Sequence, residues 1–408
     1  MPKLIYITLA RFPTEKAHGL QIVQNCEAFV SVGYEVELWV SSRFTSRELR
    51  RVRDYHAHYG VRPIFRIRRV PGLDLYPLTG GNPHLERIAF YVHTLTYLLF
   101  LCLRLLVTRA DYYYSRDEYV LYALRGWIAR AQLAYEAHLF AQTGRGAHLQ
   151  ATVTQAVGST IAITPRLRQD LIDQRGADAQ RVIVAHDGVR AERFANLPDQ
   201  RAARARIGWE QTRFIVGFVG RLHMINQDKG IGTLIDALAR CDGVTLALVG
   251  GPSAMAEQYR QQWHARGLPA SDFLYAGQVA PEDVPRYCRA FDVCAMPHPF
   301  TAQYAYYTSP LKLFEYMASE RAIVASDLPA WGDVVRHERE ALLVPAGDAT
   351  ALAEAITRLQ HDSDLRHRLG NAARERVLAH YTWQARARAI QAHLDQARAS
   401  SRNTSTRA

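Results

Sequence analysis

The sequence has few of the residue patterns that mark redox, zinc or hydrolase chemistry. Its 408 residues contain only five cysteines, and no two of them have the two-residue spacing of a zinc or redox motif. The sixteen histidines form no His-Glu-x-x-His motif, and no serine lies in a Gly-x-Ser-x-Gly elbow. Scattered cysteines and a first segment without a basic leader are typical of a protein of the reducing cytoplasm. We therefore expect a cytoplasmic protein.

Positive charge is in excess, with a formal net charge of +11. Such an excess favours anionic partners, such as nucleotide phosphates or lipid headgroups. The basic residues are spread along the chain rather than gathered beside stacking aromatic residues, so we expect no nucleic-acid partner. The densest basic run, residues 43–69, is compatible with a peripheral position on the inner face of a membrane.

One apolar segment, residues 88–107, has the length of a membrane span. It contains His93, Thr94, Thr96 and Arg104, whose side chains are costly at bilayer depth. The segment also lies between strand-like pieces of a repeating strand and helix pattern. We therefore expect a helix that packs on a sheet, either buried or apposed to a membrane, and not a spanning helix.

The rest of the chain alternates short apolar runs with helix-length amphipathic stretches, which predicts parallel sheets covered on both faces. The fold class is α/β, with two doubly wound Rossmann-like domains that face a cleft. We predict a first domain at 1–190, a polar linker at 191–212 and a second domain at 213–378. A helix at 379–398 and a disordered tail at 399–408 end the chain. The expected strands cover residues 3–10, 34–40, 65–70, 111–115, 132–138, 159–164 and 181–188 in the first domain, and 214–220, 245–251, 273–279, 292–297, 322–326 and 341–347 in the second.

Three features of the second domain favour a phosphate and ribose site. Gly220 and Arg221 end an apolar strand, and Lys229 precedes a helix, so backbone N–H groups and two positive charges can meet an anion. Ser309 and Pro310 open a second helix, with Ser309 as the expected N-cap, and Glu315 lies one turn later. A carboxylate there can accept from both hydroxyls of a ribose. Glycines at other strand ends are plain turns or further sites of backbone approach: Gly250, Gly251 and Gly277.

These segments resemble glycosyltransferase family 4, the retaining enzymes of GT-B fold. Residues 220–230 (GRLHMINQDKG) and 309–329 (SPLKLFEYMASERAIVASDLP) are similar to the donor-binding blocks of that family. Residues 16–38, 135–138 (YEAH), 182–194 and 375–387 are similar to its amino-terminal glycine loop, its functional-histidine strand, the end of its first domain and the closing helix that crosses back. The resemblance covers nearly the whole chain.

The resemblance implies a role for each matching residue. Arg221 and Lys229 hold the donor diphosphate, the backbone of Ser309, Pro310 and Leu311 binds the distal phosphate, and Glu315 binds the ribose. His138 supports the sugar or the charge that develops at its anomeric carbon, and Gly19 lets its loop approach the transferred group. Gly220, Gly250 and Gly277 complete the predicted donor site. The family has a glutamate eight residues before the second one, where this chain has Tyr307.

The resemblance also implies a reaction. A nucleotide-diphosphate sugar gives its sugar to an acceptor hydroxyl with retention of configuration, in surface polysaccharide or glycolipid synthesis. We expect no cofactor and no metal, because the Asp-x-Asp pair of Asp362 and Asp364 precedes a helix that Asp362 can cap. Two other functions use the same site: a nucleotide-sugar epimerase and a non-catalytic nucleotide-sugar-binding scaffold. A nicotinamide-dependent oxidoreductase is disfavoured, because no Gly-x-Gly-x-x-Gly follows the first strand.

Overall fold

The computed structural model describes residues 1–44, 49–222 and 229–405, with side chains to residue 399. The chain forms two compact units, which are described separately. Unit 1 contains Met1–His186 and Trp383–Ala408, and unit 2 contains Asp187–Thr382.

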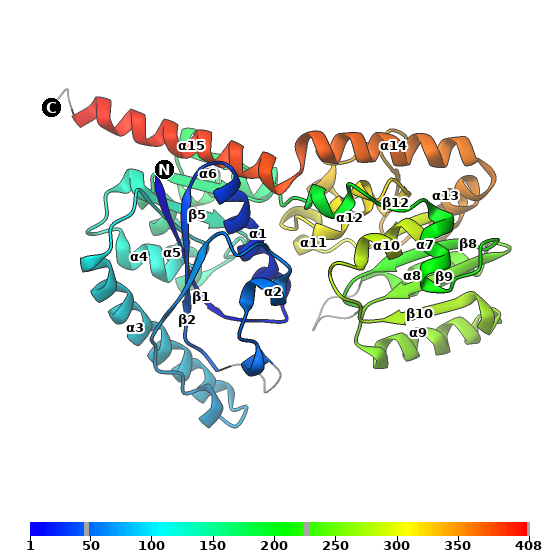
Figure 1. The fold of residues 1–408 in the computed structure, drawn as a ribbon, viewed down its shortest axis with the longest axis horizontal. Coiled ribbons are helices and arrows are strands. Elements are labelled where there is room, and N and C mark those ends of the chain that lie inside the picture. Colours follow the sequence, from blue (N-terminus) through cyan, green and yellow to red (C-terminus); the bar gives the residue numbers. More distant parts are fainter. Residues whose placement is uncertain (45–48, 223–228, 406–408) are drawn as a thin grey trace. The chain divides into compact units, whose positions relative to one another are not determined.

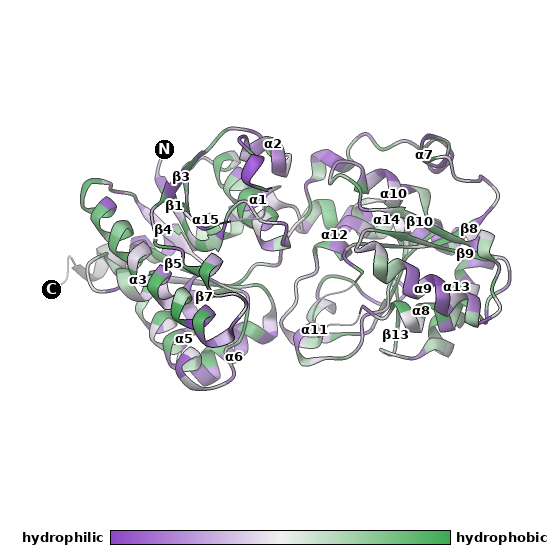
Figure 2. Cartoon of the chain, turned by 90° about the horizontal axis from the view of Figure 1, so that it is seen from below, coloured by the Kyte–Doolittle hydropathy of each residue, from purple (hydrophilic) through white to green (hydrophobic). Residues whose placement is uncertain are grey.

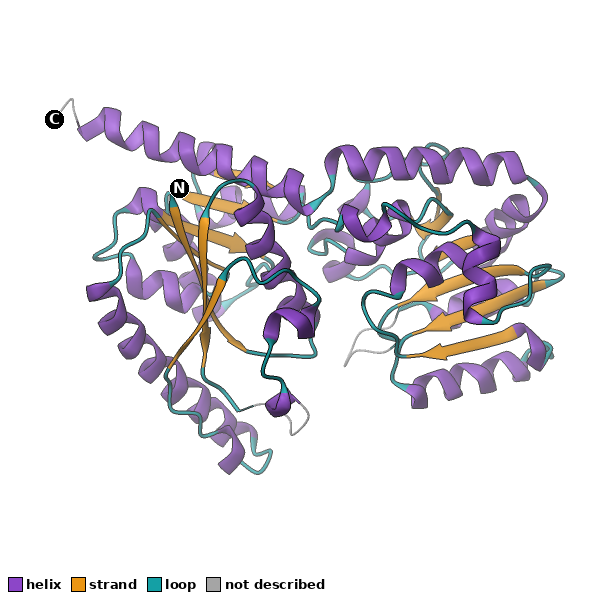
Figure 3. Cartoon of the chain, viewed as in Figure 1, coloured by secondary structure: helices purple, strands orange, loops and turns teal. Residues whose placement is uncertain are grey.

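In unit 1 the described residues form a seven-stranded sheet in the order β3-β2-β1-β4-β5-β6-β7, and every neighbouring pair is parallel. The order reverses between β1 and β4, and doubly wound sheets commonly bind ligands at the carboxyl ends of strands at such a point. The strands are drawn in Figure 3. Their bounds are β1 Lys3–Arg11, β2 Glu35–Ser41, β3 Arg66–Val70, β4 Tyr112–Ser115, β5 Leu133–Ala137, β6 Ser159–Ala162 and β7 Val182–Val184.

The last helix of the chain belongs to unit 1. It begins at Trp383, packs against α1 and continues to Ser405, past the predicted helix end at residue 398 (Figure 1). Asp395 on this helix accepts a hydrogen bond from Tyr112 Oη at 2.9 Å, which fixes the helix to β4. The helices of unit 1 are α1 Ala17–Ser31, α2 Tyr55–Tyr59, α3 Pro83–Val107, α4 Glu118–Leu124, α5 Gly144–Ala156, α6 Pro165–Arg175 and α15 Trp383–Ser405.

In unit 2 the described residues form a six-stranded, fully parallel sheet in the order β10-β9-β8-β11-β12-β13. Its strands are β8 Phe214–Val219, β9 Val244–Val249, β10 Phe273–Gly277, β11 Val293–Met296, β12 Ala322–Ser326 and β13 Leu342–Val344. The helices are α7 Gln200–Ile207, α8 Ile231–Leu238, α9 Ser253–Ala265, α10 Val284–Ala290, α11 Ala302–Tyr306, α12 Leu311–Ala318, α13 Ala349–His361 and α14 Ser363–His380.

Two hydrophobic cores cover the two faces of this sheet. Successive side chains of a strand point to opposite faces, so Val216 and Phe218 pack with α8, α9 and α13, whereas Ile215 and Val219 pack with α10, α12 and α14. Both faces are apolar because both are covered, which explains the continuous apolar runs in the sequence. Each fully buried side chain of this size contributes about 1.5–3 kcal/mol.

The apolar segment at residues 88–107 lies within α3, which packs on the sheet of unit 1 along one side only. On that side Tyr97 Oη donates to the Thr8 carbonyl at 3.3 Å, and His93 Nε2 lies 2.7 Å from Ser41 Oγ. The opposite side is exposed, with Leu95 at 71% and Leu106 at 70% of their full surface. Of the two expected arrangements, full burial is therefore excluded.

Residues 191–212 differ from the predicted linker. They contain a 3₁₀ turn at Ala191–Phe194 and the helix α7, which packs against α10 within unit 2. Arg204 on α7 is buried, and its guanidinium pairs with Asp292 at 2.6 Å and donates to the Ala290 carbonyl at 2.8 Å. The sequence predicts a linker here because the long buried side chain of α7, Arg204, is charged.

We predict that Arg204→Ala destabilises the protein by about 3–5 kcal/mol, because it leaves the carboxylate of Asp292 largely buried without its partner. Urea unfolding should show this loss as a lower transition midpoint for unit 2. The matched control is Arg206→Ala, which removes an exposed arginine from the same helix. Equal midpoints for the two variants would contradict the structural role of Arg204.

Candidate functional site

The carboxyl edge of the unit 1 sheet gathers several basic side chains. His138 follows β5, Arg116 follows β4, and His18 lies in the first turn of α1. The charge of Arg116 acts on both histidines. This edge is where ligands bind in doubly wound sheets, and it includes the strand-order reversal beside β1 and β4. The predicted position of His138 at a strand end is thus what the structure shows.

Glu136 is the centre of a buried hydrogen-bond network behind His138. Its Oε1 lies 2.5 Å from His138 Nε2 and 3.1 Å from the guanidinium of Arg386. Its Oε2 accepts from Asn25 Nδ2 at 2.9 Å and from the hydroxyl of Tyr114. Both carboxylate oxygens therefore have two partners each.

The pKa values at this edge follow from burial and from these charges. Burial, and then the charge of Arg116, lower the pKa of His138 to about 4. The same two causes lower the pKa of His18 to about 4. Burial alone would raise the pKa of Glu136, but Arg386 and His138 outweigh it and hold that pKa well below its ordinary range. At neutral pH the site therefore contains neutral histidines and an ionised glutamate.

Gly19 lies beside His18 in the first turn of α1. A Cβ atom at this position would lie 2.6 Å from the side chain of Thr14 and 2.6 Å from Tyr59 Oη. Tyr59 Oη in turn accepts from Thr14 N at 2.7 Å and donates to the Thr14 carbonyl at 3.0 Å. The close packing of Thr14 and Tyr59 thus explains a glycine at this position. The predicted approach of this loop to a sugar stays a prediction.

In unit 2, loops after three neighbouring strands are joined through their backbones. Gly220 N donates to Val249 O at 2.8 Å, and Gly250 N donates to Gly277 O at 2.7 Å. Gly250 has φ +133°, and a Cβ there would lie 1.9 Å from Gly220 O, so only glycine is tolerated. Three predicted donor-site glycines therefore form one edge at the carboxyl ends of β8, β9 and β10.

The start of α12 lies against this edge. A Cβ at Gly220 would meet the Lys312 side chain at 3.3 Å, and Tyr316 Oη accepts from Val219 N at 2.8 Å. Glu315, whose side chain is 22% exposed, pairs with Lys312 Nζ at 2.8 Å. The structure thereby brings Glu315 and Gly220 to the same end of β8.

The expected N-cap of α12 is wrong. Pro310 occupies the N-cap position without a side-chain hydrogen bond, and Leu311 is the first helical residue. Ser309 Oγ instead accepts from the backbone N–H of Asp187 at 2.8 Å. The serine hydroxyl therefore holds the loop at residue 187, and an anion at this helix start would bind backbone N–H groups only.

Lys229 lies at the end of another strand of the sheet, β11. Its Nζ donates to Tyr304 Oη at 2.7 Å, and Tyr304 makes an edge contact with the ring of His298, which follows β11. Next to Lys229, Gly230 has φ +75°, and a Cβ there would lie 1.7 Å from Pro297 O. Burial, and then Lys229, lower the pKa of His298 to about 3.

Arg221 is exposed, and within the described ranges no hydrogen bond or ion pair connects it to Lys229. Residues 223–228 of the predicted phosphate loop lie outside the part of the chain that the structure describes. The joint grip of Arg221 and Lys229 on one diphosphate thus stays a prediction. Residues 45–48 of the basic run at 43–69 lie outside it as well, as do residues 406–408 of the predicted tail.

Several site residues were not predicted from the sequence. They are Arg116, Glu136 and Arg386 around His138, and His298, Tyr304 and Lys312 in unit 2. Glu136 lies in the segment YEAH, directly before the last residue of the strand, and Lys312 lies in the segment 309–329. Both residues are therefore part of segments that resemble the family. No local pattern marks Arg386, which is 250 residues from Glu136 in the chain.

The Asp-x-Asp pair has the predicted capping role. Asp362 Oδ1 accepts from Leu365 N at 2.8 Å and is the N-cap of α14. Among the described residues, no group of three His, Cys, Asp or Glu side chains could hold a metal ion.

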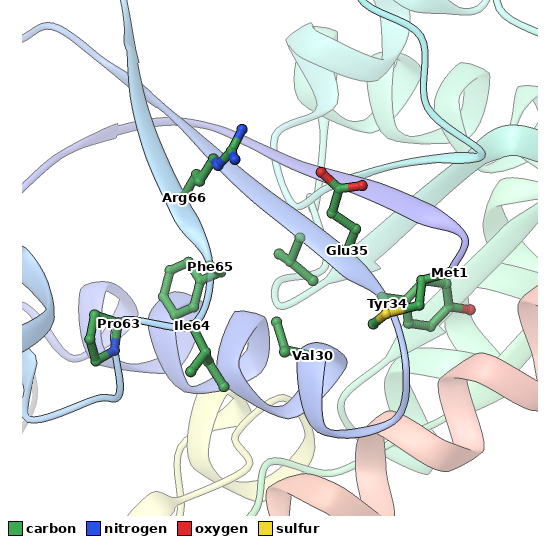
Figure 4. A pocket seen from close by; sticks show the side chains of 9 residues that line it. Met1, Val30, Tyr34, Glu35, Pro63, Ile64, Phe65 and Arg66 are labelled. Carbon is green, nitrogen blue, oxygen red and sulfur yellow. The ribbon is translucent and has the colours of Figure 1, made fainter.

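A surface cavity of about 530 Å³ lies at the opposite edge of the unit 1 sheet (Figure 4). Glu35 and Arg66, at the amino ends of β2 and β3, contribute to its wall with Tyr34. Since doubly wound sheets bind ligands at the carboxyl ends of their strands, this cavity is not part of the candidate site.

Residues 213–362 match the family model described as "Glycosyl transferases group 1". A D-inositol 3-phosphate glycosyltransferase of Streptomyces bingchenggensis is 27% identical over 65% of this chain and 63% of its own length. A phosphatidyl-myo-inositol mannosyltransferase of Mycobacterium leprae is 33% identical over 55% of each chain. The matches thus span less than two thirds of these two relatives.

Solved structures match over nearly the whole chain. Sucrose-phosphate synthase from Thermosynechococcus elongatus superposes with a TM-score of 0.75 at 21% identity, covering 98% of this chain and 100% of its own. HepE from Anabaena, in complex with UDP-glucose, has a TM-score of 0.64 at 19% identity and coverages of 97% and 100%. The architecture is therefore the GT-B fold, with two Rossmann-like units. Residues 213–362 are thus similar to the glycosyl transferases group 1 family, and the two relatives named above are glycosyltransferases.

The buried histidines predict how stability depends on pH. The pKa of His298 is about 3 in the folded protein and roughly 6.5 in the unfolded chain, so the unfolded state binds more protons between these values. Its contribution to stability is complete above pH 6.5 and is lost as the pH falls towards 3. Between pH 7.5 and 5.0 the expected loss is about 2 kcal/mol.

Urea unfolding of the wild type and of His298→Gln at both pH values measures this contribution. The variant should lose about 2 kcal/mol less than the wild type on acidification. His264→Gln, at an exposed position of α9, serves as the control. An acid dependence unchanged in His298→Gln would show that His298 is not held neutral in the fold.

Proposed function

We propose that this protein transfers a sugar from a nucleotide-diphosphate donor to an acceptor hydroxyl, with retention of configuration. The observation that carries this proposal is the edge at the end of β8, where Gly220, the start of α12 and Glu315 lie together. Backbone N–H groups at a helix start suit a phosphate, and a carboxylate one turn later suits the hydroxyls of the attached ribose. The match of residues 213–362 to the glycosyl transferases group 1 model supports the same class of reaction.

In this proposal each group of residues contacts a different part of the donor. Lys229 and Arg221 neutralise the diphosphate as it leaves, and the backbone of Ser309, Pro310 and Leu311 holds its distal phosphate. Glu315 binds the ribose, while Lys312 balances its charge at 2.8 Å. His138 supports the transferred sugar.

The names of the relatives support a choice of substrates. One structural relative binds UDP-glucose, and others are named for D-inositol 3-phosphate, phosphatidyl-myo-inositol and lipopolysaccharide acceptors. We therefore take uridine diphosphate sugars as the first donors to test, and surface polysaccharide or glycolipid precursors as the acceptor class. A scaffold would bind such a donor without turnover, and an epimerase would convert it without an acceptor.

We predict that Glu315→Gln weakens the nucleotide diphosphate by roughly 1.5–3 kcal/mol, or about ten- to a hundredfold, because an amide only half replaces a carboxylate that accepts from two hydroxyls. Thermal shift against UDP, GDP and ADP identifies the base, and titration then gives the affinities. Glu354→Gln, an exposed glutamate on α13, is the matched control.

A 2′,3′-dideoxy nucleotide separates ribose binding from other roles of Glu315. The analogue should bind the wild type weakly and should lose little further affinity in Glu315→Gln. If the variant lost as much affinity for the analogue as for the normal nucleotide, Glu315 would not contact the ribose hydroxyls.

We also propose that unit 1 docks on the inner face of an anionic membrane, in the cytoplasm, through the outer side of α3. The helix, coloured by residue hydropathy in Figure 2, is long and apolar enough to cross a membrane. Only 28% of its most apolar stretch is buried. Its exposed apolar side chains run along the helix at intervals of three or four residues, as in an interfacial helix. They are Leu85, Ile88, Tyr91, Leu95, Leu99, Leu103 and Leu106.

The charges beside this side of α3 suit anionic lipid. Arg87 on the helix and Arg109 just after its end are both exposed, and Glu86 is its one acidic residue. On α4, which packs against α3, Tyr122 is also exposed and lies under the guanidinium of Arg125 at 3.5 Å. Apolar burial combined with positive charge favours a bilayer of anionic lipid over a neutral surface.

We expect the protein to co-sediment with phosphatidylglycerol-containing vesicles at low salt and to be released at high salt, because exposed charges are screened within roughly 10 Å at 0.1 M. Leu95→Glu with Leu99→Glu should abolish binding. Ile64→Glu, at an exposed apolar position away from α3, should leave it unchanged. Loss of binding in all variants alike, or concentration-dependent dimers that the α3 variants disrupt, would overturn the proposal.

A further inference from the structure

We propose that Glu136, held by Arg386 of α15, positions His138 with its proton on Nε2, so that Nδ1 accepts a hydrogen bond from a hydroxyl of the transferred sugar. The proposal rests on the proposed function for the identity of that hydroxyl. The arrangement of the three side chains is independent of it. Glu136 and Arg386 act through His138 and are positioning residues.

The position of the proton on His138 follows from its contact with Glu136. An ionised carboxylate can only accept hydrogen bonds, and Glu136 Oε1 lies 2.5 Å from His138 Nε2. The nitrogen that faces Glu136 must therefore carry the proton. Glu136 cannot turn away, because Asn25 and Tyr114 donate to its other oxygen.

Arg386, whose side chain is 2% exposed, pairs with Glu136. Its Nη2 lies 3.1 Å from Glu136 Oε1, its Nη1 donates to Asn25 Oδ1 at 2.9 Å, and its Nε donates to His186 O at 3.1 Å. The arginine thus fixes both Glu136 and the residue that supports Glu136. It also supplies the charge that keeps a buried carboxylate ionised.

The charge on the imidazole of His138 depends on its burial and on the charged groups around it. The groups that face His138 are Glu136 on β5, Arg116 after β4, Arg386 on α15 and His18 on α1. Burial of a side chain that is only 10% exposed disfavours the charged imidazole most, and the charge of Arg116 adds to this effect, so that together they outweigh Glu136. The ring therefore stays neutral at pH 7.

The charge and the tautomer of His138 determine what its ring can bind. In a neutral imidazole with a proton on Nε2, Nδ1 is a hydrogen-bond acceptor. Within the described residues no hydrogen bond to Nδ1 is formed. A sugar hydroxyl can donate to this atom, whereas a phosphate oxygen cannot. His138 is thus suited to the sugar of the donor and not to its diphosphate.

The test compares Glu136→Gln, Arg386→Met and Gln391→Ala. The last is the matched control, since Gln391 ties the same helix to Val32 O at 2.9 Å but lies outside the network. Nitrogen NMR of histidine-labelled protein, assigned with His138→Gln, gives the tautomer at pH 7.5 and the titration of His138 below it. The wild type and the control should show a single tautomer protonated on Nε2, and Glu136→Gln should lose it.

The two network variants should shift the titration of His138 in opposite directions. Glu136→Gln removes a negative neighbour and should lower its pKa further, whereas Arg386→Met removes a positive neighbour and should raise it. A general loosening of the fold would move both variants in the same direction. Same-direction shifts, or a wild-type ring protonated on Nδ1, would overturn the proposal.

Turnover of donors tests the ligand of Nδ1. With the wild type, one monodeoxy analogue of the donor sugar should have a kcat/KM roughly tenfold or more below that of the normal donor. With Glu136→Gln the same analogue should differ little from the normal donor, because only the wild type holds Nδ1 of His138 in place. Equal discrimination by both proteins would contradict the assignment. If the wild type turned over no donor, the proposed function and the assigned hydroxyl would fail, whereas the tautomer would still decide whether Glu136 positions the ring.

Discussion

The parallel direction of all strands is the constraint on which the candidate site depends. In each unit it brings every strand's carboxyl end to one edge, so residues far apart in the sequence become neighbours. In unit 2 this edge brings the glycine loops to the start of α12, where Glu315 lies. In unit 1 it brings His138 and Arg116 together beside the first turn of α1.

Each unit also contains a buried pair of opposite charges. Arg204 with Asp292, and Glu136 with Arg386, are pairs that the fold removes from water and satisfies with further hydrogen bonds. Such pairs add little net stability compared with apolar residues, but they tolerate only one arrangement of their partners. They therefore fix where a short helix and a terminal helix dock.

The strands could be predicted because both faces of each sheet are covered, which leaves apolar runs such as FIVGFV in the sequence. The positions of Glu315 and His138 could be predicted as strand-end or helix-start residues, but their roles came from resemblance to a family. Residues 191–212 were predicted to be a linker because a charged residue in a polar segment, such as Arg204, gives no sign of burial. Glu136 and Arg386 were missed because a pair 250 residues apart has no local pattern, and Ser309 was misassigned because its hydroxyl bonds to a distant backbone.

The split of unit 1 between the two ends of the chain has a consequence for biosynthesis. During translation residues 1–186 leave the ribosome well before Trp383 and the rest of α15 exist. Until then Glu136 lacks Arg386, and the side of α1 that packs against α15 is uncovered. Unit 2, which is continuous in the chain, can complete its fold first. We therefore expect the nascent protein to complete unit 1 last, once α15 has left the ribosome.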